Sequence, residues 1–211
     1  MKERPILFSG PMVRAILEGR KTVTRRVVSP QPAHGEGIVW LRNIVSRPPS
    51  FAIVRSGSSN VREIGCPFGV PGDRLWVRET FAESVPGCEE QGGFSYRADH
   101  VDPRGDGPAH SMTWRPSIFM RREASRITLD VVSVRAERLH DITDEDIAAE
   151  GVDREAVMST LGPVDREIVS SGGLIRCPRD AWRLGWNAIN GKRAPWSANP
   201  WVWRVEFRRA A

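Results

Sequence analysis

The sequence predicts an α+β fold, specifically a small and mostly β barrel with short flanking helices and inserted loops. Three observations carry this prediction. Short apolar strands recur along the chain, short amphipathic helices separate them, and the alternation of the longest strand changes phase partway along. At 211 residues and 40% hydrophobic content, the chain is long enough to bury a substantial core as a single domain.

The first quarter of the chain predicts a strand, a helix and a loop. A strand is expected at Ile6–Phe8, and Pro11 then suits the first turn of a helix that Gly19 can end. Four apolar residues share one face of this helix: Met12, Val13, Ile16 and Leu17. Residues 29–37 and much of 56–72 are typical of loops, and the segments 38–45 and 51–55 between them predict a hairpin.

The central part predicts a strand through Leu75 and Val77 after a Pro-Gly-Asp turn, then a surface excursion at 84–113. The longest β signal follows at 125–139. Its apolar residues occupy odd positions up to Val131 and even positions from Val132 onward. A change of phase indicates a bulge near 131–132, a device that small barrels use to coil their strands.

The last third predicts two helices and a closing strand. Thr143 suits the N-cap of a helix that begins with three acidic residues and ends at Gly151. A second helix over 178–191 places Trp182 and Trp186 on one face, where packing is the expected role of both. In the final strand, Trp201 and Trp203 begin an apolar alternation with the pattern of core residues.

Composition narrows the class of protein. No apolar run approaches the roughly 18 residues of a membrane span, and the N-terminus lacks the features of a signal peptide, so we expect no membrane partner. Three widely spaced cysteines, Cys66, Cys88 and Cys177, favour a reducing cytoplasm without disulfides. Together with His100 and His110 they lack zinc-ligand spacing, so we expect no metal and no cofactor.

The basic residues point to a particular segment and a kind of partner. The formal net charge is +5, which favours a polyanionic or phosphate-bearing partner, although an arginine-rich solvated surface gives the same balance. Only three of the 31 basic residues are lysines, and Lys21 stands beside Thr24 in "LEGRKTVTRR". Lysine can lose its proton when it is buried or crowded by cations, whereas arginine cannot.

Several segments together resemble ASCH-domain proteins of the PUA-like superfamily, in particular phage and prophage members of similar length. The segments are "ILEGRKTVTRR", "PGDRLWVRETF", "LHDITDEDIAAEGV" and the tryptophan-bearing C-terminal strand. The family's Gly-x-Lys-x-x-Thr type of motif corresponds to Gly19, Lys21 and Thr24. Relative to the smallest members, this single domain of residues 1–211 would carry insertions at about 29–65, 84–115 and 153–195.

The resemblance implies a β-barrel with a cleft for RNA or nucleosides. One bacterial branch of the family hydrolyses N4-acetylcytidine with a Lys, a Thr and a Glu. Lys21 and Thr24 match the first two, and Glu150, late in the helix after the long strand, matches the third. Other members are described as ribonucleases or RNA binders, so the resemblance also implies those alternatives.

The chemistry of such an amidohydrolase assigns a role to each residue. Thr24 would be the nucleophile and Lys21 the base that activates it, because the neighbouring arginines favour the uncharged amine. Glu150, at the negative end of its helix, would take up and return a proton. A close Glu150–Lys21 contact would instead hold the lysine charged. Lys21 and Thr24 would point to opposite faces of a regular strand, so this hypothesis requires irregular backbone at about 20–23.

Six further residues are candidates for substrate binding: Arg20, Arg25, Arg26, Trp76, Arg78 and Glu79. Surface salt bridges are the alternative role of the charged residues, and core packing is the alternative for Trp76, which could stack a base. The alternative for Lys21 and Thr24 is an exposed helix exit, and the alternative for Glu150 is a solvated helix end.

The sequence thus favours a cytoplasmic hydrolase acting on an N-acylated nucleoside or RNA base. The alternatives are a non-catalytic RNA- or nucleic-acid-binding module, or a ribonuclease, each using the same cleft. In all three the partner is a nucleoside or RNA.

Overall fold

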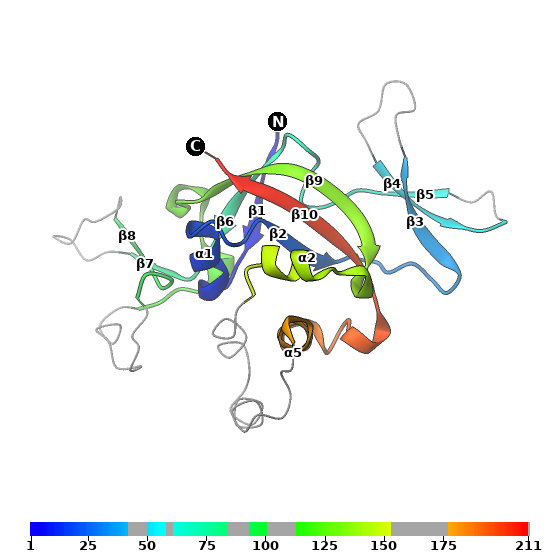
Figure 1. The fold of residues 1–211 in the computed structure, drawn as a ribbon. Helices are drawn as coiled ribbons and strands as arrows, with labels where there is room; N and C mark the ends of the chain where they lie inside the picture. The colour runs from blue at the N-terminus through cyan, green and yellow to red at the C-terminus, as the bar shows by residue number, and fades with distance from the viewer. Residues whose placement is uncertain (42–49, 58–60, 84–92, 101–112, 153–176, 211) are drawn as a thin grey trace.

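The computed structural model describes residues 1–41, 50–57, 61–83, 93–100, 113–152 and 177–210, and it is α+β, as the sequence predicts (Figure 1). The α-helices are α1 (Gly10–Leu17), α2 (Asp144–Ala149) and α5 (Pro178–Asn190). Short 3-10 turns are η2 (Ser117–Phe119), η3 (Arg122–Ala124), η4 (Leu139–Asp141) and η5 (Trp196–Ala198).

The central sheet has five strands in the order β1-β6-β9-β10-β2. These strands are β1 (Glu3–Leu7), β6 (Arg74–Arg78), β9 (Thr128–Arg138), β10 (Trp201–Arg209) and β2 (Val23–Val27). Only β1 and β6 are parallel. In the described part of the chain this sheet is open rather than a closed barrel, with β1 and β2 at its edges. A side chain spans these edges, because Arg26 Nη2 donates to the carbonyl oxygen of Leu7 at 2.5 Å.

The bulge predicted in the longest strand is present in β9. Its pairing with β10 matches Ser133 to Glu206 and then Val131 to Phe207, so Val132 is an extra residue without a partner. Val132 is also 45% exposed, whereas Val131 is buried. The bulge therefore lets both apolar phases of this strand face the core, as the change of phase in the sequence indicates.

Both faces of β10 are covered, which the apolar alternation of this strand did not predict. Trp203 and Val205 belong to the main core with residues of β1, β6 and α1. Val202 lies in a second core beneath the other face, with Trp182 and Trp186 of α5. Figure 1 shows β9 and β10 arching over α2, with α5 beyond it. On this second face Val202 and Arg204 are therefore buried, whereas Arg208 near the end of the strand is exposed.

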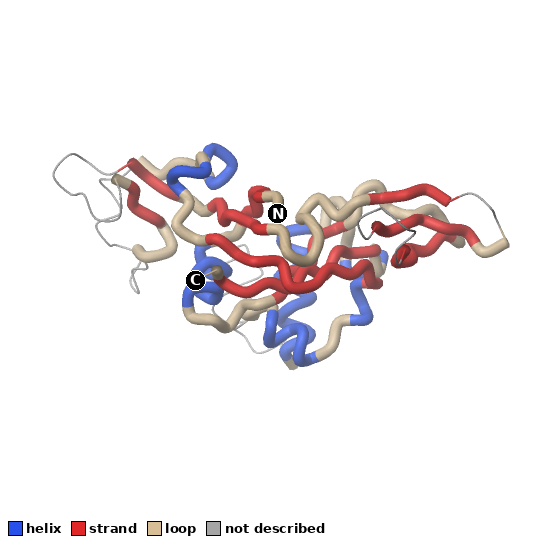
Figure 2. Tube along the Cα trace, turned by 90° about the horizontal axis from the view of Figure 1, so that it is seen from above, coloured by secondary structure: helices blue, strands red, loops and turns tan. Residues whose placement is uncertain are grey.

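Two small sheets extend from opposite ends of the central one (Figure 2). One consists of β3 (Glu36–Leu41), β4 (Ser50–Arg55) and β5 (Val61–Ile64), and the other of β7 (Phe81–Glu83) and β8 (Phe94–Tyr96). β3 and β4 pair antiparallel, which confirms the predicted hairpin over its described residues. Phe51 packs on Trp203 with ring centroids 4.7 Å apart. Described residues of the segment 29–65, among them Ile38, Phe51 and Ile53, thus contribute to the main core.

Candidate functional site

The chain leaves α1 through irregular backbone, which is what the sequence-based hypothesis requires. Gly19 adopts a left-handed φ of +75°, and β2 begins only at Val23. Between them, the Lys21 amide donates to Ala15 at 2.9 Å and the Thr22 amide donates to Ala149 at 2.8 Å. The strict alternation of a strand therefore does not apply to residues 20–22, and this segment is attached to the end of α2.

Lys21 is buried with all three of its N–H groups engaged. Its Nζ donates at 2.8 Å to the carbonyl oxygens of Val23 and Glu150 and at 2.8 Å to the Glu150 carboxylate. Its side chain is 0% exposed. Burial lowers the pKa of Lys21, whereas the Glu150 carboxylate opposes that shift and Arg26 adds to it. Three acceptors around one nitrogen fit an ammonium ion, so the resting lysine is the charged partner of Glu150.

A glycine makes this close packing possible. Gly151 ends α2 with φ +69°, and a Cβ there would stand 2.8 Å from the Cβ of Ala15 and 2.9 Å from the Cβ of Lys21. Both distances are shorter than side chains tolerate, so only a residue without a Cβ fits between α1 and the lysine. The Gly151 predicted as a helix terminator therefore also sets how near Glu150 lies to Lys21.

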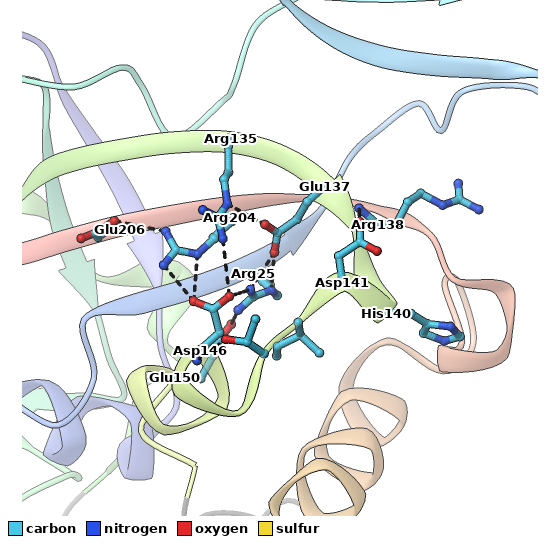
Figure 3. A network of polar contacts seen from close by, with 12 residues as sticks. Arg25, Arg135, Glu137, Arg138, His140, Asp141, Asp146, Glu150, Arg204 and Glu206 are labelled. Carbon is cyan, nitrogen blue, oxygen red and sulfur yellow. Dashed lines mark hydrogen bonds and ion pairs between the residues drawn. The ribbon is translucent and has the colours of Figure 1, made fainter.

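Glu150 also contacts Arg25, which is the centre of a larger polar network (Figure 3). Arg25 Nη1 lies 3.4 Å from the Glu150 carboxylate, Nε donates to Glu137 at 2.8 Å, and Nη2 donates to Asp146 at 2.5 Å. The Arg25 side chain is 0% exposed. Four elements meet in this network, because β2, β9 and α2 supply these residues and β10 supplies Arg204, which donates to Asp146.

The network holds Asp146 ionised. Burial acts to raise the pKa of Asp146, but Arg204 and Arg25 outweigh it and hold that pKa below its ordinary value. Arg204 donates two hydrogen bonds to one Asp146 oxygen, at 2.8 and 3.1 Å, and Arg25 contacts the other. Asp146 and Arg25 hold one another in place, so the Arg25 side chain has a fixed position beside Glu150. The nitrogen atoms of Arg25 already have carboxylate partners.

A pocket lies against this arrangement, between the edge of the sheet and α5. It encloses about 740 Å³ of space, part of it open to solvent. Thr24, Arg26 and Glu150 line it from one side, and Trp182 and Trp186 from the other. Further lining residues come from the start of α1, the end of α2 and the rest of α5: Ser9, Pro11, Met12, Gly151, Val152, Gly185, Ile189 and Asn190. The pocket therefore has one polar wall and one aromatic wall.

The three catalytic candidates are brought together here. Thr24 and Glu150 line the pocket, and Lys21 lies behind it, bonded to Glu150 and to the carbonyl of Val23, the residue before Thr24. Of the substrate-binding candidates, Arg25 and Arg26 line the pocket. Arg26 lies over the Phe8 ring with its guanidinium carbon 5.1 Å from the centroid.

The other four candidates do not belong to the described lining of this pocket. Arg20 is exposed and pairs with Glu18 at 2.7 Å. The guanidinium carbon of Arg78 stands 4.6 Å from the centroid of Trp76, which is 9% exposed and has the core character that was the alternative for it.

Glu79 forms a separate buried cluster. It is 2% exposed and accepts from Arg126 at 3.0 and 3.1 Å. Burial raises the pKa of Glu79, and Arg126 opposes that shift. Arg126 in turn donates to Asp99 at 2.6 Å, so its charge is shared between two acids.

Sequence reasoning missed the aromatic wall and most of the network. Trp182 and Trp186 were assigned to packing alone, yet besides packing with rings stacked 5.4 Å apart they line the pocket. Asp146 had the pattern of a solvated acid in a first helical turn. Arg204, flanked by apolar residues of the closing strand, was the available signal, because a buried arginine requires an acid.

Metal and membrane sites are not found in the described part of the chain. No group of three metal-ligating side chains occurs there, although Cys88 and His110 lie outside the described residues. No described helix combines the length and apolarity that a membrane span needs.

Comparison of the chain with family models, with curated proteins and with solved structures finds no match. The assignment of a function therefore depends on the geometry of this pocket and on the sequence motifs that lead into it.

Proposed function

We propose that this protein is a cytoplasmic hydrolase of the ASCH, PUA-like type that removes an acyl group from a modified nucleoside or RNA base, as N4-acetylcytidine amidohydrolases do. The observation that carries the proposal is the buried Lys21–Glu150 ion pair behind a pocket that Thr24 lines. A nucleophile, a base and a proton carrier are the three groups that amide hydrolysis needs.

The proposed reaction has three proton movements, of which the first follows the Lys21–Glu150 contact. The resting Lys21 ammonium passes a proton to Glu150 across their 2.8 Å contact, and burial of the amine favours this step. The neutral amine then takes the proton of the Thr24 hydroxyl as its oxygen attacks the acyl carbonyl. Glu150 gives its proton to the departing nitrogen, and water later releases the acid from Thr24.

The aromatic wall of the pocket favours a planar substrate. Trp182 and Trp186 of α5 line the same pocket as Thr24 and Glu150, and aromatic side chains bind the flat faces of bases with little dependence on sequence. A nucleobase between these walls would present its face to the tryptophans and its acylated edge to Thr24 and Glu150.

The test is release of free acid from a panel of N-acylated nucleosides, starting with N4-acetylcytidine. Thr24→Val replaces the hydroxyl with a methyl group of similar size, and we expect turnover to be lost. Thr22→Val is the matched control, because Thr22 is exposed two residues away and we expect it to retain activity. Lys21→Met and Glu150→Gln should each lower kcat. Equal turnover in both threonine variants would overturn the proposal.

A specific observation favours the second candidate, a nucleic-acid-binding module that uses the same pocket. All three N–H groups of Lys21 already have acceptors, and Arg25 is bonded to three acids, so these two cations have their partners without a reaction. This candidate predicts binding of RNA that weakens steeply with salt and that does not change in Thr24→Val.

A further inference from the structure

A second groove lies beyond the end of β2, separate from the pocket that Thr24 lines. The loop after β2, the end of β9 and the connection between α5 and β10 form its walls. We call it the Trp201 groove; its principal lining residues are Gln31, His34, Arg138, Arg193, Pro200 and Trp201. None of these residues lines the Thr24 pocket.

The walls of the Trp201 groove are held in place by hydrogen bonds. The Gln31 side chain accepts from the Trp201 amide at 2.8 Å and donates to the Trp201 carbonyl oxygen at 2.9 Å. Asn199 adopts a left-handed φ of +43°, and its side chain accepts from the His140 amide at 2.8 Å. Two polar side chains thus clamp the backbone on either side of Pro200, so the position of Trp201 is fixed.

Two arginines supply the positive charge of the groove. Neither Arg138 nor Arg193 has an ion-pair partner among the described residues, whereas Arg25, Arg126 and Arg204 each contact two or more acids. Figure 3 shows the Arg138 side chain extending away from the Arg25 network.

Two acids near the groove are engaged elsewhere. Glu36, which also lines it, accepts from the Ala33 amide at 2.8 Å and stands 4.0 Å from Arg62. Asp141 accepts from the Arg138 backbone amide at 3.2 Å. The Arg138 and Arg193 guanidinium groups therefore remain available to an anionic ligand, and Glu36 is the acid that lines the groove with them.

An aromatic ring accompanies the free cations. The guanidinium carbon of Arg138 lies 5.5 Å from the centroid of Trp201, which is only partly buried. Gly37 of β3 lies beside the ring, where a Cβ would stand 3.8 Å from Cζ2 of Trp201, an ordinary contact distance.

We propose that the Trp201 groove binds a nucleotide unit, with a phosphate held by Arg138 and Arg193 and the base against Trp201. Guanidinium groups bind phosphate oxygens through paired hydrogen bonds, and aromatic rings next to cations are the platforms on which unpaired bases stack. The unit belongs either to a free nucleotide or to a single-stranded nucleic acid. This site does not depend on the hydrolase activity proposed for the Thr24 pocket.

The experiment uses fluorescence anisotropy of the full-length protein with a labelled oligouridine of about eight nucleotides, a length within single-strand site sizes. The variant is Arg138→Ala/Arg193→Ala. The matched control is Arg208→Ala/Arg209→Ala, which removes the same charge from exposed residues at the far end of β10. Competition by free uridine monophosphate distinguishes a free nucleotide from a chain as the ligand, and either source supports the proposal.

We expect the groove variant to bind roughly tenfold more weakly at 0.1 M salt, and its log–log salt slope to fall by about 0.7, which is one single-strand phosphate contact. The control should change both quantities much less. Equal losses in both variants would reduce the effect to net charge and overturn the proposal. An unchanged salt slope in the groove variant, or wild type that binds neither ligand at low salt, would also overturn it. Thr24→Val should leave this binding intact, so failure of either proposal can be recognised separately.

Discussion

Replacing Arg25 by methionine should be among the most destabilising changes on the sheet edge. The side chain is 0% exposed and bonds to Glu137, Asp146 and Glu150. Methionine fills similar volume but leaves buried carboxylates without that cation. Removing one partner of a buried ion pair typically costs about 3–5 kcal/mol, because the remaining charge stays desolvated.

The expected change can be measured by thermal unfolding followed by circular dichroism. For a domain of this size, 1 kcal/mol shifts Tm by roughly 2–4 °C, so Arg25→Met should lower Tm by roughly 6–20 °C. The control is Arg208→Met, whose side chain is 76% exposed and lies 3.7 Å from Asp130. A surface pair of this kind contributes at most about 1 kcal/mol.

The loss of stability in Arg25→Met should also depend on pH. The guanidinium groups hold the folded-state pKa of Asp146 below its ordinary value. This contribution is therefore complete above the unfolded-state pKa of about 3.9 and is lost as the pH falls through the folded-state pKa. The gap between wild type and Arg25→Met should be widest near neutrality and shrink below about pH 4. A Tm equal to that of the control at pH 7 would refute the argument that the network stabilises the fold.

Two further outcomes follow from local geometry. Gly151→Ala should destabilise the protein by about 2–4 kcal/mol in urea unfolding, because it adds a steric clash to the strain of a positive φ. Gly35→Ala is the control, since the φ of Gly35 is +80° but no atom lies within 4 Å of the added Cβ. It should therefore cost only about 1 kcal/mol. Equal losses of stability in the two variants would contradict the argument that a clash destabilises Gly151→Ala. Burial raises the pKa of Cys66 to about 11, so with Cys88 replaced by serine, a thiol reagent at pH 8 should modify the exposed Cys177 far faster than Cys66. Similar rates for the two thiols in folded protein would show that Cys66 is not protected.

The parts of the fold that the sequence predicts well are those whose signals are local. The N-cap at Thr143, whose hydroxyl accepts from the Asp146 amide at 3.2 Å, needs only neighbouring residues. The bulge at Val132 can likewise be recognised from the alternation within one strand. These features depend on backbone preferences and on side-chain spacing over a few residues, so one sequence is enough to predict them.

The candidate site was predicted only in part, because many of its contacts join residues that are far apart in the sequence. Lys21, Thr24 and Glu150 come from motif positions; in the structure Thr24 and Glu150 line one pocket, and Lys21 lies behind it, bonded to Glu150. The ion-pair network beside these residues does not come from motif positions. Arg204 is 58 positions from Asp146 along the chain, and its burial depends on helices that cover the second face of β10. No local pattern indicates such contacts, which is also why Trp182 was assigned to packing alone.

Closure of the sheet into a barrel also depends on long-range contacts that the sequence does not indicate. The bulge and coil of β9 are present, but whether β1 and β2 pair depends on how far the sheet curls. In the described structure these edges meet through the side chain of Arg26 rather than through backbone hydrogen bonds.

The most direct test of the proposed chemistry is to identify the acylated residue. Wild type would be mixed briefly with N4-acetylcytidine, quenched in acid, digested and analysed by mass spectrometry. Our account predicts an acetyl group on Thr24 that forms and decays with turnover and that is absent from Thr24→Val. Turnover without acetyl-Thr24, undiminished in Thr24→Val, would contradict the account and assign the attack to water.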